Sequence, residues 1–251
     1  MKPSFLLSLL AAIACGHVPP GPVTRSPAAI QVDGTSVEVR HADEDAAVAD
    51  QVRRVVPRAV RASAQWGSLP ASVTVTIHAT HADLEAATGR TGNAWMRAWA
   101  RIGAVDLQSP TTWSRGHASD DALTQILAHE LTHCVLFQAV GRGERAREIP
   151  MWFQEGMASV AAGEHHTLAH ADAVSSPAPL LRSDPKLVYG TADRAFRDLV
   201  LRFGEPRVRL LLARLGEGHA FSAAFRDAMG MTLAEFEGDL SRRLSAVAVN
   251  G

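Results

Sequence analysis

Residues 129–133 read His-Glu-Leu-Thr-His and lie in the middle of the strongest helical pattern in the chain, residues 120–139. Capping and acidic residues precede the pattern and glycines follow it, as is typical of a complete helix. Side chains four positions apart share one helix face, roughly 5–6 Å apart between Cβ atoms. The imidazoles of His129 and His133 can therefore converge on one metal ion, and Glu130 can reach a water on that ion.

A second segment, Pro-Met-Trp-Phe-Gln-Glu-Gly-Met-Ala-Ser at 150–159, predicts a helix that runs to about residue 162. Glu155 follows His133 by 155 − 133 = 22 positions, which leaves room for the rest of the first helix, a turn and a return helix. Aromatic and apolar residues surround Glu155, so we expect its carboxylate to be partly buried and to need a partner. We expect Gly156 to allow close approach of another helix.

Together the two segments resemble the gluzincin metallopeptidases, especially the bacterial peptidase MA-like group. The resemblance rests on His-Glu-x-x-His followed by Pro-x-Trp-x-x-Glu-Gly-x-Ala, and it extends over about residues 70–245. It implies a hydrolase of peptide bonds in which one Zn²⁺ is bound by His129, His133 and Glu155, with Glu130 as general base. Three protein ligands leave a fourth position for water, as catalytic zinc requires. No further cofactor is expected.

The resemblance also raises two questions about neighbouring residues. Related enzymes place a Tyr or His where the oxyanion develops, and Tyr189, the only tyrosine, is our candidate for this catalytic role; a packing or hydrogen-bonded tyrosine is the alternative. In thermolysin-like relatives an aspartate four residues after the third ligand supports a ligand histidine, but that position is Ser159 here. We expect the support to come from Asp120, Asp121 or a backbone carbonyl.

Strand and helix patterns are mixed before the metal motif. Alternation around an Asp-Gly turn predicts a short hairpin or a strand at 30–41, and residues 72–78 and 102–108 predict further strands. The last of these resembles the edge strand that lines the substrate cleft in the family. Only helical patterns follow residue 189. The sequence therefore predicts an α+β, zincin-like fold: a small mixed N-terminal lobe with the sheet and the active-site helix, then an all-helical C-terminal lobe.

The start of the chain predicts export. Lys2 precedes an apolar run at 5–14 that is too short to span a bilayer, as in a signal peptide. Small residues directly before Cys15 resemble the lipobox of bacterial lipoproteins; an ordinary signal peptide cut at the same bond is the alternative. We expect a cell-envelope lipoprotein anchored through Cys15, on the periplasmic side or outer membrane, or a secreted protein. The predicted parts are a signal peptide at 1–14, a tether at 15–29, an α+β lobe at 30–162 and a helical lobe at 163–251.

The expected partner is a peptide or protein substrate. A formal net charge of −1 gives no reason to expect nucleic acid, and the sequence does not indicate an oligomeric state. Cys134 points to a different helix face from His133, so we expect a buried structural thiol. Trp95 and Trp99 are interpreted as packing residues rather than a recognition platform. The remaining histidines singled out, His117, His165, His166 and His170, are expected at the surface or the cleft rim.

Two other functions stay open. A catalytically inactive, zinc-binding envelope module would hold the ion without cleaving anything. A zinc hydrolase acting on a non-protein amide or ester would activate water in the same way. The presence of Glu130 favours an enzyme, because metal binding alone does not require that residue.

Overall fold

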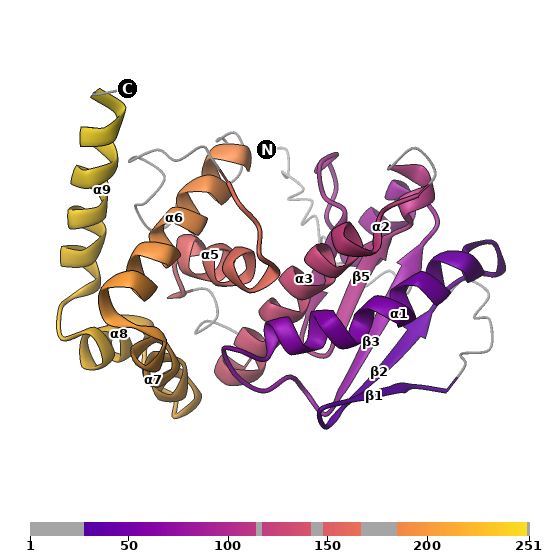
Figure 1. The fold of residues 1–251 in the computed structure, drawn as a ribbon, viewed down its shortest axis with the longest axis horizontal. Helices are drawn as coiled ribbons and strands as arrows, with labels where there is room; N and C mark the ends of the chain where they lie inside the picture. Colours follow the sequence, from indigo (N-terminus) through magenta and orange to yellow (C-terminus); the bar gives the residue numbers. More distant parts are fainter. Residues whose placement is uncertain (1–27, 114–116, 142–147, 167–184, 250–251) are drawn as a thin grey trace, which may run out of the picture.

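A five-stranded mixed sheet and a larger set of helices make up the computed structural model, which describes residues 28–113, 117–141, 148–166 and 185–249 (Figure 1). The strand order is β1-β2-β3-β5-β4. The three inner strands β2 (Thr35–Arg40), β3 (Ser72–His78) and β5 (Ala104–Gln108) are parallel to one another. β1 (Ile30–Val32) and β4 (Ala98–Arg101) are antiparallel to their neighbours and form the two edges. The chain within the described ranges is therefore α+β.

The predicted hairpin at 30–41 is confirmed. Asp33 and Gly34 connect β1 to β2, and both have positive φ, at 47° and 87°. Two successive residues with positive φ are typical of the type I′ turn, whose twist matches that of paired strands. The strand predicted at 72–78 is also present, with alternate side chains buried.

The prediction that residues 102–108 form the edge strand is wrong. Ile102 and Gly103 form the turn of a hairpin, with Gly103 at φ 68°, and the strand begins only at Ala104. This strand, β5, lies inside the sheet between β3 and β4. The short strand β4, which the sequence pattern did not reveal, forms the edge instead.

Two long helices cover one face of the sheet (Figure 1). α1 (Ala46–Ser63) packs against α3 (Asp120–Val140), which carries the His-Glu-Leu-Thr-His segment and also contacts β4 and β5. The shorter α2 (His81–Thr88) opens with the predicted capping box at Thr80 and contacts β3 and β5. Two short 3-10 helices, Asp43–Asp45 and Pro110–Thr112, flank these elements.

The remaining described helices gather at the other end of the molecule (Figure 1). α5 lies between α3 and α6, and buried phenylalanines of α5, α6, α8 and α9 meet around it. No helix within the described ranges is long and apolar enough to cross a membrane. The bounds are α5 (Met151–Ala162), α6 (Pro185–Phe203), α7 (Glu205–Gly216), α8 (Phe221–Met229) and α9 (Leu233–Val249).

Gly156 allows α5 to touch the backbone of α6. A Cβ atom at this position would lie 2.2 Å from the carbonyl oxygen of Ala192 and 2.6 Å from Cβ of Phe196. Neither neighbour is the end of a flexible side chain, so one helix would have to move. The close helix approach expected at Gly156 is therefore present, and it fixes the position of the adjacent Glu155.

We expect Gly156→Ala to lower the free energy of unfolding by about 1–3 kcal/mol, because overpacking outweighs the better helix propensity of alanine. The matched control is Gly238→Ala in α9, where the nearest atom to a new Cβ is the end of the Arg242 side chain at 3.5 Å. That control should stabilise the protein by up to about 1 kcal/mol. Chemical denaturation measures the free energy of unfolding of both variants. Equal stabilisation by the two substitutions would contradict a close contact at Gly156.

Candidate metal centre

The two histidines of α3 face the same side of the helix. Ser119 accepts a hydrogen bond from the backbone N–H of Ala122 at 3.1 Å and so caps the helix, as expected from its acidic, polar start. One turn apart, the rings of His129 and His133 have centroids 5.0 Å apart. Their exposed fractions are only 8% and 9%. Two buried imidazoles so placed require polar partners.

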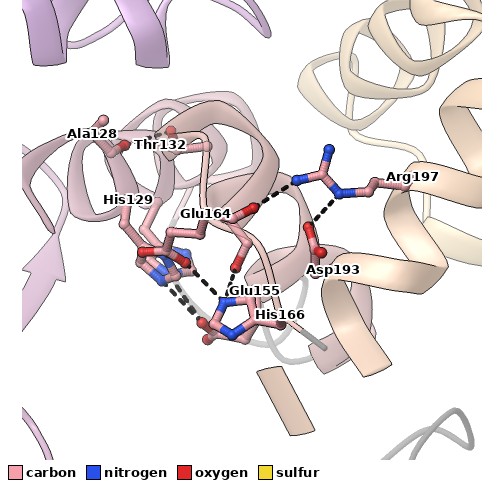
Figure 2. A network of polar contacts seen from close by, with 10 residues as sticks. Ala128, His129, Thr132, Glu155, Glu164, His166, Asp193 and Arg197 are labelled. Carbon is pink, nitrogen blue, oxygen red and sulfur yellow. Dashed lines mark hydrogen bonds and ion pairs between the residues drawn. The ribbon is translucent and has the colours of Figure 1, made fainter. Parts of the chain in front are cut away.

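Glu155 of α5 supplies that partner. Its Oε2 lies 3.2 Å from Nε2 of His129 and 3.5 Å from Nε2 of His133. One nitrogen or oxygen from each of the three residues lies within 4.8 Å of the other two. Figure 2 shows the Glu155 carboxylate pointing from its helix toward the His129 ring. The structure therefore brings together the three residues that the sequence suggested as a ligand set.

The pKa values of these side chains depend strongly on one another, because the groups are in contact and largely shielded from water. Burial acts to raise the pKa of the Glu155 carboxyl, but His133 and His129 outweigh it and hold that pKa well below its usual range. Burial likewise acts to lower the pKa of His129, but hydrogen bonds to Glu155 and Glu164 raise it well above its usual value. A divalent cation would replace the proton that these groups share. Two imidazole nitrogens and a carboxylate oxygen are donors that fit Zn²⁺.

Glu164 supports His129 from behind. Its Oε2 lies 3.3 Å from Nδ1 of His129, the ring nitrogen that faces away from Glu155, and 3.2 Å from Nε2 of His166. The backbone carbonyl of Glu164 accepts a hydrogen bond from Arg197 at 2.7 Å, and Arg197 is held by Asp193 at 2.8 Å (Figure 2). Carboxylates in this position orient a ligand imidazole and raise its basicity.

Sequence reasoning missed Glu164, and its prediction for Asp120 and Asp121 is wrong. Asp120 accepts a hydrogen bond from Gln51 and Asp121 pairs with Arg58, both on α1 at the exposed start of α3. The sequence feature that could have pointed to Glu164 was Gly163. This glycine ends α5 in the left-handed conformation at φ 68° and turns the chain back.

Ser159 allows this different arrangement. It stands four residues after Glu155, where the resemblance described above implies an aspartate, and it is fully buried. Its hydroxyl lies 3.5 Å from Nε2 of His166 and helps to lower the pKa of Glu164. Burial acts to raise the pKa of Glu164, but the hydrogen bonds from His129 and His166 hold it well below its usual range. A small hydroxyl thus leaves room for a carboxylate that arrives from the next segment of chain.

Glu130 and Tyr189 border the same group. Burial raises the pKa of Glu130, while the imidazoles of His129 and His133 oppose the rise. The ring of Tyr189, on α6, has its centroid 6.1 Å from that of His129. Burial, with a further contribution from the carboxylates of the site, raises the pKa of Tyr189 well above its usual value. The phenol therefore keeps its proton and can act as a donor.

The cysteine beside His133 lies outside the site. Cys134 is buried, its thiol hydrogen-bonds to the carbonyl of Arg101 at 3.1 Å, and burial raises its pKa to about 12. The prediction of a buried structural thiol is confirmed. His117 and His165 are exposed, as expected, whereas His166 contacts Glu164. His170, the signal peptide at 1–14 and Cys15 lie outside the described residues.

Comparison with known proteins gives limited guidance. No family model and no curated protein matches the chain. Among solved structures, an M1 zinc metallopeptidase from Deinococcus radiodurans is 17% identical with a TM-score of 0.47, over 89% of this chain and 52% of the other. A mutant of the M1 zinc metallopeptidase from that organism is 16% identical with a TM-score of 0.49, over the same shares. The chain spans about half the length of these structures. The assignment of a function therefore rests on the side chains of the site itself.

We expect Glu164→Ala to weaken zinc binding by about 10–100-fold, because His129 loses the carboxylate that orients it. Competition with a fluorescent zinc chelator measures this affinity without any assay of activity. The matched control is Glu237→Gln, which changes a carboxylate that bonds Trp152 Nε1 at 2.8 Å and should leave zinc affinity unchanged. An unaltered affinity in the Glu164 variant would show that this contact does not support the metal.

Proposed function

We propose that the protein is a zinc-dependent metallopeptidase of the zincin-like, gluzincin type, with one Zn²⁺ held by His129, His133 and Glu155. The observation that carries the proposal is the convergence of three donor atoms, from two helices, within 4.8 Å of one another. Three protein ligands suit a catalytic ion, because a structural zinc site takes its fourth ligand from the protein as well. The Glu164 carboxylate behind His129 adds the support that ligand histidines normally have.

Glu130 is the proposed general base. A bound zinc ion would supply Lewis acidity, polarising the scissile carbonyl and lowering the pKa of water to about 7. Glu130 follows the proposed ligand His129 directly on α3, and its carboxylate interacts electrostatically with His129, His133 and Glu155. This supports a position from which it would reach a water on the ion. It would take the proton from the attacking water and then pass it to the leaving amine.

Tyr189 is the proposed oxyanion donor. α6 brings its ring beside His129, so the phenol belongs to the helical part of the molecule while two of the ligands come from α3. A protonated hydroxyl in this place would donate a hydrogen bond to the oxygen on which negative charge develops. In this role the hydroxyl of Tyr189 stays protonated and the side chain stays neutral throughout.

The substrate is proposed to be a peptide or protein met outside the cytoplasm, after export as a lipoprotein anchored through Cys15 or as a secreted protein. Two alternatives use the same three ligands. An inactive envelope module would not need a partly buried carboxylate at Glu130, which is costly to maintain beside Glu155. A hydrolase of non-protein amides or esters would use the same base and is separated from a peptidase only by its substrates.

Glu130→Gln should lower the rate of peptide cleavage by about 10²–10⁴-fold while one zinc per chain is retained, because the base is lost but no ligand is. Casein and a quenched peptide library, each with and without a chelator, measure the cleavage, and metal analysis measures the zinc. Turnover in the variant at close to the wild-type rate would refute the role of Glu130. Zinc bound by the wild type without chelator-sensitive cleavage would favour the inactive module, and cleavage of amides or esters alone would favour the other hydrolase.

A further inference from the structure

Trp95 is a large apolar side chain that the fold leaves unusually open to solvent. Its exposed fraction is 46%, although the next residue, Met96, is buried at 2%. Single exposed apolar residues are common on protein surfaces and need no explanation by themselves. Trp95 differs because of what its ring touches and how its segment is held.

The indole ring of Trp95 reaches the tyrosine beside the metal centre. The centroids of Trp95 and Tyr189 are 6.0 Å apart with an angle of 74° between the rings, an edge-to-face contact. Tyr189 in turn lies 6.1 Å from His129, centroid to centroid. Trp95 therefore stands one aromatic ring away from a proposed zinc ligand, on the part of the chain that leads into the edge strand β4.

The segment that carries Trp95 is fixed by hydrogen bonds. The Glu85 carboxylate accepts from the backbone N–H groups of Gly92 at 2.7 Å and Asn93 at 3.3 Å. The N–H of Met96 donates to the carbonyl of Asn93 at 2.8 Å and closes a turn around Trp95. The exposed indole is thus presented from a braced turn with a buried residue next to it. A surface held in this way loses little conformational entropy when it binds a ligand.

An exposed, pre-positioned indole beside a hydrolytic centre can bind one class of group well. Nearly half of its surface stays exposed while the ring also contacts Tyr189, so aromatic or large aliphatic side chains gain most from covering the exposed apolar part. We propose that Trp95 is a specificity-determining residue that receives an aromatic or large aliphatic side chain of the peptide next to the scissile bond. The inference rests on the proposed peptidase function. It replaces the interpretation of Trp95 as a packing residue only.

The test uses pairs of quenched fluorescent peptides that differ only in Phe or Ala at one of the two positions flanking the scissile bond. The wild type should cleave the Phe peptide of one pair with at least about tenfold higher kcat/KM, the worth of one apolar subsite. Trp95→Ala should lower that ratio by about tenfold, with a much smaller change for the Ala peptide. The matched control is Trp99→Ala. The guanidinium of Arg90 lies 3.8 Å over the Trp99 ring, so that ring face is already covered by this chain. The Trp99 variant should therefore keep the wild-type ratio.

A binding measurement separates recognition from catalysis. In the Glu130→Gln background, calorimetry with the same peptides should show about tenfold weaker binding of the Phe peptide when Trp95→Ala is added, and little change for the Ala peptide. Cleavage by the wild type with a Phe-to-Ala ratio that Trp95→Ala leaves unchanged would overturn this inference alone. A wild type that neither cleaves nor binds any of the peptides would overturn the proposed function, and this inference with it.

Discussion

The interaction on which the site depends is the contact of one Glu155 carboxylate oxygen with the Nε2 atoms of two histidines on another helix. A buried carboxylate is costly unless it is paired, so this contact requires α5 to be held firmly against α3. A neighbouring face of α5 provides the hold, because Gly156 allows its backbone to meet α6. The packing of α3, α5 and α6 and the contact among the three side chains therefore form one constraint. A shift of one helix would also move the carboxylate relative to the two imidazoles.

Glu164 extends this constraint into the helical part of the molecule. Its carboxylate touches His129 of α3, while its backbone carbonyl is bound by Arg197 of α6 (Figure 2). A continuous set of polar contacts thus joins a proposed ligand to the helix that also carries Tyr189. Metal binding would stabilise this set of contacts, because binding energy for a folded site adds to folding energy. Asp193 is buried and paired with Arg197, and it holds the Arg197 side chain at the α6 end of these contacts.

The features that could be predicted from the sequence are those that local chemistry determines. Helix α3, the turn at Asp33 and Gly34, and the capping box at Thr80 each follow from a few adjacent residues. The proximity of Glu155 to the histidines was predicted from the resemblance of residues 150–159 to a known ligand-bearing helix, because the spacing by itself only leaves room for a return helix. The strand β4 could not, since its four residues, Ala-Trp-Ala-Arg, have no β-branched side chain and form a strand only by pairing with β5.

Glu164 escaped prediction for a different reason, and its position bears on the balance of charge. Its side chain reaches His129 only because Gly163 reverses the chain in a left-handed conformation, which sequence spacing does not encode. Its arrival places a third carboxylate beside those of Glu130 and Glu155 around two buried imidazoles. Like charges so close repel strongly where water is scarce. A divalent cation between the imidazoles would offset that repulsion and leave both rings neutral, as metal ligands must be. The number of carboxylates gathered here is thus itself an argument for a metal rather than for a set of ion pairs.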